Sequence, residues 1–196
     1  MLFNCIIAGV GGQGTVLASK LIAAAAMKRG FDVRTTETIG MAQRGGCVVS
    51  HLRIGSSIDE IYSPVVPLGK ADAIVAFEPA EAVRQISYLS PDGSLITCGT
   101  AVKPIGSAGT YEASAMIDYL KENVEKLAVI DGQEIMEKCV KALNVAVLGA
   151  AAESGVFPFD AATMKEALPE VVPERFIELN NTAFELGRKL YNERNK

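Results

Sequence analysis

The amino-acid sequence predicts an α/β protein. We expect a Rossmann-like, doubly wound, mostly parallel sheet with helices on both faces, in a single domain. Apolar runs of strand length alternate along the chain with longer segments of helical periodicity. The first run, residues 3–8, breaks into glycines and resumes as an alanine-rich helix. The chain has 196 residues, 49% of them hydrophobic, which is enough for one core of ordinary size.

The first unit is a strand, a glycine turn, a helix and a second strand. The turn reads Gly9-Val10-Gly11-Gly12-Gln13-Gly14-Thr15. The helix is expected from about residue 13 to residue 29, with Gly30 in the position of a C′ glycine. Residues 31–36 form the second strand. This β-α-β unit should cross right-handed between parallel strands.

The middle of the chain continues with a glycine-rich loop over residues 39–46. A β-branched run, residues 47–54, predicts a strand with one polar face. Residues 58–62 are expected as a short strand antiparallel to it. A buried strand at 73–77, a helix opened by Glu78-Pro79, a turn at 91–93 and a strand at 94–98 follow.

The last third of the sequence is mostly helical. Helices are expected at 116–124 and 132–143, with a short strand at 127–130 between them. Residues 144–153 are apolar throughout, so periodicity does not decide between a strand and a buried helix. Two amphipathic helices should follow, at 160–168 with Asp160 as N-cap and at 173–191.

Composition and charge exclude several classes of protein. The chain has 19 basic and 23 acidic residues, a net charge of -4 and no basic block, so nucleic acid is not an expected partner. Apolar stretches are too short to span a bilayer, and no signal peptide opens the chain, so we expect a cytoplasmic protein with no membrane contact. Cys5, Cys47, Cys98 and Cys139 contain no CxxC pair, which argues against a metal site in this chain alone.

The first glycine turn predicts an anion site. Gly9, Gly11 and Gly14 satisfy GxGxxG between a strand and a helix, and a helix N-terminus stabilises a phosphate or carboxylate. Glu37 follows Gly14 by 23 residues, roughly where a dinucleotide-binding fold places its ribose-binding acid. On these residues alone, NAD binding and a purely structural role for the glycines are equally supported.

The second glycine-rich loop favours a ligand site. Gln43 and Arg44 are flanked by Gly40, Gly45 and Gly46, and the loop follows the second strand, at the carboxyl end of the sheet. Ligands of α/β folds bind at that edge, and a guanidinium matches carboxylate or phosphate groups. The competing interpretation is a simple turn with its arginine in solvent.

A self-contained hydrolase or metalloenzyme has little support. Ser50 and His51 are consecutive strand residues, so their side chains point to opposite faces. The single histidine is more often a satisfied strand residue than a catalyst. No Ser-His-Asp order, HExxH motif or adjacent pair of carboxylates stands out.

The two glycine-rich segments together resemble a known family. The sequence Gly9-Val10-Gly11-Gly12-Gln13-Gly14 and the later Thr36-Glu37-Thr38-Ile39-Gly40-Met41-Ala42-Gln43-Arg44-Gly45-Gly46 are similar to the gamma subunit, or gamma domain, of 2-oxoacid:ferredoxin oxidoreductases. Within that family the chain looks most like the small (beta) subunits of indolepyruvate ferredoxin oxidoreductases. The resemblance implies one gamma-type domain of the pyruvate/ketoisovalerate oxidoreductases over residues 1–196.

This resemblance implies the oxidative decarboxylation of a 2-oxoacid such as an aryl pyruvate. The acyl group is joined to coenzyme A, the co-substrate, and electrons pass to ferredoxin. Thiamine diphosphate and the iron–sulfur clusters would lie on a large partner subunit, with no cofactor held by this chain alone. The chemistry then belongs to the cofactor, and this subunit would shape or close the site.

The two segments supply the candidate site residues. For cofactor binding these are Gly9, Gly11, Gly12, Gln13, Gly14 and Thr15. In the loop that faces substrate or partner they are Glu37, Met41, Gln43, Arg44, Gly45 and Gly46. Arg44 would contact a phosphate or carboxylate, and Gln43 a polar ligand edge. No catalytic residue is assigned, and Cys47 is given no catalytic role.

Two alternatives remain at this stage. One is a free-standing NAD(P)-binding Rossmann oxidoreductase with Glu37 on the ribose. The other is a non-catalytic assembly subunit whose loops only join other subunits.

Overall fold

The computed structural model describes residues 1–40, 46–101 and 111–194. Within these ranges six strands form one sheet in the order β2-β3-β1-β4-β5-β6. Their bounds are β1 (Leu2–Val10), β2 (Asp32–Ile39), β3 (Cys47–Gly55), β4 (Ala71–Ala76), β5 (Leu89–Cys98) and β6 (Lys126–Ile130). Strands and helices are interspersed along the described chain, so the α/β prediction is confirmed.

Most of the sheet is parallel, with one reversed strand. β1 pairs with β4, β4 with β5 and β5 with β6 in parallel register. β3 is antiparallel to both of its neighbours, β1 and β2. β1 and β2 therefore run in the same direction, as a β-α-β unit requires, but β3 lies between them. The sequence did not indicate this insertion.

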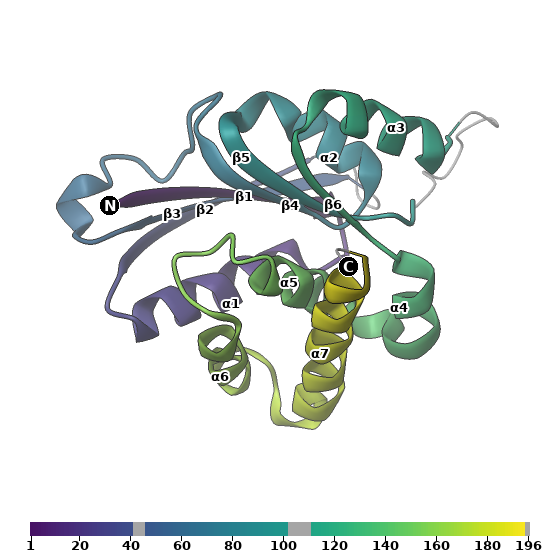
Figure 1. The fold of residues 1–196 in the computed structure, drawn as a ribbon. Helices are drawn as coiled ribbons and strands as arrows, with labels where there is room; N and C mark the ends of the chain where they lie inside the picture. The colour runs from purple at the N-terminus through teal and green to yellow at the C-terminus, as the bar shows by residue number, and fades with distance from the viewer. Residues whose placement is uncertain (41–45, 102–110, 195–196) are drawn as a thin grey trace.

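Helices cover both faces of the sheet (Figure 1). α2 (Pro79–Gln85) and α3 (Ala113–Asn123) lie over one face. The other face is covered by α1 (Thr15–Lys28), α5 (Leu143–Glu153), α6 (Ala161–Val171) and α7 (Ile177–Arg194). α4 (Gly132–Cys139) follows β6 and precedes α5. The doubly wound arrangement is confirmed.

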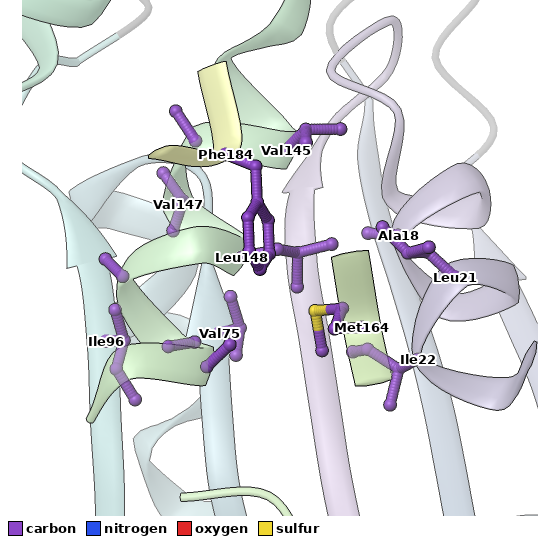
Figure 2. Packing of buried hydrophobic residues seen from close by; sticks show 14 of the residues in the cluster. Ala18, Leu21, Ile22, Val75, Ile96, Val145, Val147, Leu148, Met164 and Phe184 are labelled. Atoms are coloured by element: carbon purple, nitrogen blue, oxygen red, sulfur yellow. The ribbon is translucent and has the colours of Figure 1, made fainter. Parts of the chain in front are cut away.

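The larger hydrophobic core lies under α1, α5, α6 and α7 (Figure 2). There Phe184 and Leu148 pack among Val75 of the sheet, Ile22 of α1 and Met164 of α6. Residues 144–152 of α5 are all buried. A helix that is buried on every side needs no polar face, which explains why the periodicity of this segment was uninformative. A smaller core around Ile6, Ile74 and Leu95 lies on the α2 side.

Two sequence predictions are wrong at the level of local structure. Residues 58–60 form a 3₁₀ helix, not a strand, because the Ser57 side chain caps the Asp59 N–H at 3.3 Å. Residues 91–93 lie inside β5 and not in a turn. The register between β4 and β5 shifts here, from Ala71 opposite Leu89 to Ala73 opposite Ser94. This bulge absorbs the Pro-Asp-Gly sequence within the strand.

The predicted helix ends are well placed. Gly30 follows α1 with φ +79°, and its N–H bonds to the Met27 carbonyl at 3.0 Å. Asp160 caps α6 by accepting the Thr163 N–H at 2.8 Å.

Among the described residues, no helix is both long enough and apolar enough to cross a membrane.

Candidate functional site

The carboxyl ends of β1, β2 and β4 meet at one edge of the sheet. Ala8 of β1 lies opposite Ala76 of β4, and Val10 lies opposite Cys47, the first residue of β3. Both glycine-rich segments therefore begin at this edge. It is also where the chain order reverses, between β1 and β4, and open α/β sheets bind their ligands in that crevice.

The first glycine turn uses its glycines in different ways. Gly12 and Gly14 have φ values of +96° and +78°, a backbone conformation that favours glycine. Gly9 lies within β1, where a Cβ atom would stand 2.9 Å from Gln13 Oε1 and 3.1 Å from Phe77. Gly12, and not Gly9, is thus the glycine that the tight turn requires, although the GxGxxG pattern gives the tight turn to its first glycine.

The side chain of Gln13 holds this turn in place. Its Oε1 accepts the Val10 N–H at 2.8 Å, and its Nε2 lies 3.5 Å from the Phe77 carbonyl oxygen. The amide thus ties the end of β1 to the residue that follows β4. Its predicted role toward a ligand stays a prediction.

The N-terminus of α1 opens into a hollow of about 210 Å³. The first helical bond runs from the Ala18 N–H to the Gly14 carbonyl, so the N–H groups of residues 15–17 precede the helical ladder. No acidic residue lies in this first turn. Gly12, Gly14, Lys141 and Asn144 line the hollow. A cationic side chain beside open N–H groups favours an anionic ligand group here.

The two glycine-rich segments are hydrogen-bonded to each other. The Gly11 N–H donates to the Gly46 carbonyl at 2.8 Å. At the other end of the second loop, the Gly40 N–H donates to the Cys47 carbonyl at 2.7 Å. The two predicted segments therefore lie side by side. Met41, Gln43, Arg44 and Gly45 lie outside the described residues.

Glu37 is poorly placed for a ribose. It is exposed on β2, opposite Ser50 of β3, which in turn lies opposite Ile7 of β1. With neighbouring strands about 5 Å apart, the intervening β3 puts Glu37 about twice that distance from β1. A dinucleotide-binding acid belongs on the strand beside β1, so this arrangement disfavours the NAD alternative.

A group of polar residues that the sequence analysis missed lies at the same edge. Glu78, two residues beyond the end of β4, is 1% exposed, and both its carboxylate oxygens lie within 2.8 Å of the Tyr111 hydroxyl. Glu81, one helical turn on, is fully buried and bonds to Arg84. Burial raises the pKa of Glu78. An acid directly after a buried strand, with a second acid three residues later, is the signal that could have identified this pair.

Cys47 joins this group from β3. Burial, together with the nearby Glu81 carboxylate, raises the pKa of the Cys47 thiol to about 12. The thiolate, and not the thiol, is the reactive form of cysteine. Cys47 therefore stays in its protonated, unreactive form.

His51 has a structural role on the same face. Its Nδ1 accepts the Val66 N–H at 3.3 Å, and its ring packs edge-to-face on Tyr88 with centroids 5.5 Å apart. Burial lowers the pKa of His51, which keeps the imidazole neutral. Ser50 is buried on the opposite face of β3, as the alternation of a strand requires.

The cysteines are too dispersed to hold a cluster together. Cys5 lies on β1, Cys47 on β3, Cys98 on β5 and Cys139 on α4. The described residues contain no group of three or more His, Cys, Asp or Glu side chains that could hold a metal ion. Larger hollows, of about 380 and 400 Å³, lie beside β6 and are lined by none of the predicted site residues.

Comparison with known proteins identifies the family. Residues 4–190 match the pyruvate ferredoxin/flavodoxin oxidoreductase family. The chain belongs to this family. It is 35% identical to the indolepyruvate oxidoreductase subunit IorB of Thermococcus kodakarensis over 198 residues. This alignment covers 97% of this chain and 96% of that protein.

Two solved structures share the fold of this family member. One is the gamma subunit of a keto/oxoacid ferredoxin oxidoreductase from Geobacter sulfurreducens, with a TM-score of 0.69 and 23% identity over 97% of this chain and 99% of the other. The second is the 2-oxoglutarate:ferredoxin oxidoreductase of Magnetococcus marinus, solved with 2-oxoglutarate, coenzyme A and succinyl-CoA bound. It has a TM-score of 0.70 and 22% identity over 98% of this chain and 31% of the other.

Proposed function

We propose that this chain is the small subunit of a 2-oxoacid ferredoxin oxidoreductase that acts on indolepyruvate or a related aryl pyruvate. The family match and the identity to an indolepyruvate oxidoreductase subunit over nearly the whole of both chains support this function. The whole chain, residues 1–196, acts as a single gamma-type domain. It works in the cytoplasm, with ferredoxin as the electron acceptor of the assembled enzyme.

The observation that carries the proposal is the hydrogen bond between the two glycine-rich segments. The bond from Gly11 to Gly46 holds the open N-terminus of α1 beside the ends of the loop that contains Gln43 and Arg44. The result is half of a site: donors for an anionic group, without a complete catalytic set. A large subunit that carries thiamine diphosphate and iron–sulfur clusters would supply the other half.

In this arrangement the chain binds and encloses the ligand, and the chemical steps take place on the cofactor of the large subunit. The first turn receives an anionic group of thiamine diphosphate, coenzyme A or the oxoacid at the N-terminus of α1. Arg44 pairs with a phosphate or carboxylate, and Gln43 with a polar edge of the ligand. Closing the two subunits over the ligand excludes water, which strengthens each of these contacts.

Reconstitution with the large subunit tests the proposal. The complex should oxidise indolepyruvate with coenzyme A and reduce ferredoxin, whereas the isolated chain should not bind NADH. Arg44→Ala should lower kcat/KM by about 10- to 100-fold, because a charge-assisted bond contributes about 1.5–3 kcal/mol. Gln43→Ala should cause a smaller loss.

Arg34→Ala is a matched control, because Arg34 is exposed on β2 and lies outside the site. Its kinetics should equal those of the wild-type chain. Tight NADH binding by the isolated chain would overturn the subunit assignment. Unchanged turnover in the Arg44→Ala and Gln43→Ala complexes would support a purely assembling role for the loop.

A further inference from the structure

The two edge strands of the sheet differ in how they are protected. β6 has five residues, begins with the exposed Lys126, and ends with Val129 and Ile130, which are buried. β2 has eight residues, contains neither lysine nor proline, and pairs with β3 in unbroken register from Asp32 to Ile39. Proteins usually protect an edge strand by shortening it, by lysine or proline, or by a bulge. β2 is therefore the less protected edge.

β2 also projects beyond the helices. Its residues are exposed except for Val33 and Thr36, which are half-buried. Because side chains alternate between the two faces of a strand, exposure of consecutive residues means that neither face of β2 is fully covered. Within the described part of the chain, β3 is the one strand beside β2. The backbone N–H and C=O groups on the outer side of β2 are thus open to a strand from another chain.

The sequence of β2 fits a second copy of itself. Two copies related by a two-fold axis perpendicular to the sheet run antiparallel, and residues that face each other then lie on the same face of the sheet. An axis at Thr36 places no like charges opposite each other and allows about six to eight backbone hydrogen bonds. The facing pairs are then Thr36 with Thr36, Thr35 with Glu37, Arg34 with Thr38, and Val33 with Ile39.

Other registers are less favourable. With the axis at Arg34 or at Glu37, two identical charges would face each other, which is destabilising. With the axis at Thr35, Val33 would face Glu37, and Ile39 would have no partner within β2. Axes nearer either end of the strand pair only a few residues. The pattern of charged and apolar residues therefore selects the register centred on Thr36.

Ile39 gives this register its apolar contact. Its side chain is 67% exposed, whereas Val33, on the same face of β2, packs against the larger core. In the register centred on Thr36, each Ile39 lies beside Val33 of the second copy, so the symmetry forms the contact twice. The contact removes apolar surface from water and extends the core across the interface.

We propose that β2 pairs antiparallel with β2 of a second copy of this chain, about a two-fold axis at Thr36, so that the two sheets become one continuous sheet. The carboxyl ends of the two β2 strands then point in opposite directions. The glycine-rich segments of the two copies therefore lie at opposite ends of the joined sheet, where both stay open to a large subunit. This pairing is independent of the proposed function and compatible with it.

Disulfide trapping on the full-length chain tests the register. Thr36→Cys places two thiols directly opposite each other, with Cα atoms about 4.5–5.5 Å apart, which is within the range of a disulfide. Thr38→Cys is the matched control. Thr38 lies on the same face and is more exposed than Thr36, but its two copies would be separated by about 13 Å along the strands.

Mild oxidation should link the Thr36→Cys chains into a dimer at least about 10-fold faster than the Thr38→Cys chains, because thiols held opposite each other react as an intramolecular pair. Non-reducing gel electrophoresis measures this. The wild-type chain, treated in the same way, controls for the partly exposed Cys47. Equal rates for the two variants, or faster linkage at position 38, would overturn the proposal.

Analytical ultracentrifugation measures the association without a cysteine substitution. The wild-type chain should form dimers reversibly as its concentration is raised to about 1 mM, the range of a weak interface. Thr36→Lys sets two like charges opposite each other and should raise the Kd by about 3- to 10-fold. Thr182→Lys, at an exposed position on α7, should leave the Kd unchanged. A monomeric wild-type chain throughout this range, or equal Kd values for the two variants, would contradict the pairing.

Addition of the large subunit distinguishes the other occupant of this edge. The disulfide-linked Thr36→Cys dimer should still bind large subunits, because its two glycine-rich ends remain open. Loss of the wild-type dimer on addition of the large subunit, with cross-linking of position 36 to that subunit, would overturn the proposal and assign β2 to the large subunit. A chain that dimerises through position 36 but supports no 2-oxoacid oxidation would overturn the proposed function alone.

Discussion

Helix α5 meets the rest of the molecule in two ways, and glycine serves each differently. In its middle, Gly149 faces the Phe184 carbonyl of α7, and Gly187 of α7 faces the Ala146 carbonyl of α5. The two backbones touch, and nothing remains open to a ligand. At its start, Asn144 Nδ2 donates to the Gly14 carbonyl at 3.2 Å, beside the open N–H groups of α1. The α5–α7 contact is close packing of two helices, whereas the contact between Asn144 and Gly14 leaves backbone N–H groups of α1 without an intrahelical partner.

This difference shows why a glycine motif by itself is weak evidence of function. At the α5–α7 contact, as in the first turn, a larger residue could not replace glycine without cost. The glycines of the α5–α7 contact nevertheless only allow two helices to approach each other. Glycine favours ligand binding where it exposes polar backbone groups, as Gly12 and Gly14 do at the edge of the sheet.

The largest expected effect breaks the packing contact. A Cβ atom at position 187 would overlap the Ala146 carbonyl oxygen, so Gly187→Ala should destabilise the fold by more than about 4 kcal/mol or prevent folding. Urea denaturation measures this. Gly155→Ala is the control: its φ is +72° with no atom within 4 Å of the added Cβ, so only about 1–2 kcal/mol of strain is expected. Equal losses in both variants would contradict the close α5–α7 contact.

A smaller loss is expected at the turn. Gly14→Ala combines a φ of +78° with an overlap of the new Cβ on the Asn144 side chain, for about 2–4 kcal/mol. Gly12→Ala meets no atom within 4 Å and should lose only about 1–2 kcal/mol through its φ of +96°. Thermal unfolding of the two variants, side by side, shows whether the Asn144 contact is as close as described. A Gly12→Ala variant less stable than Gly14→Ala would contradict it.

The third prediction concerns pH and the α2 side of the sheet. Burial lowers the pKa of His51 in the folded chain, so the unfolded chain binds its proton more readily. His51 therefore costs no stability above its unfolded pKa of about 6.5, and stability falls as the pH drops below that value. Protonation would also set a second N–H against that of Val66.

Urea denaturation at pH 7.5 and pH 5.5 measures this loss, with His51→Gln as the control because it does not titrate there. Burial raises the pKa of Glu78, so the contribution of Glu78 to stability increases as the pH falls. This contribution is the same in the wild-type chain and in His51→Gln. The stability difference between the chains should therefore shift in favour of His51→Gln at the lower pH. A constant difference would mean that His51 is not buried as a neutral base.

The smallest effect involves no change of stability. With its pKa raised to about 12, the Cys47 thiol should react slowly with iodoacetamide at pH 8, although it is partly exposed. Glu81→Gln removes the adjacent charge and should speed this alkylation several-fold, as followed by mass spectrometry. Alkylation in the wild-type chain at the rate of a free thiol would contradict the raised pKa of Cys47.

The sequence by itself determined most of the order of strands and helices, the glycine turn, the C-terminal end of α1 and the start of α6. These features depend on local causes: backbone freedom at Gly30, side-chain capping by Asp160, and apolar runs of strand length. The same local information indicated that both glycine-rich segments would lie at the carboxyl edge of the sheet. The roles of Arg44 and Gln43 there stay predictions.

Only the tertiary structure decided which strands became neighbours and which acids were buried together. Pairing of β3 between β1 and β2 is a long-range choice, and it moved Glu37 away from the first turn. Glu78 and Tyr111 are 33 residues apart in the sequence. They meet only because β4 ends and α3 begins at the same edge of the sheet. A short stretch of sequence determines which local structures and hydrogen bonds a residue can form. Its partner in the fold depends on how segments that are distant in the sequence pack together.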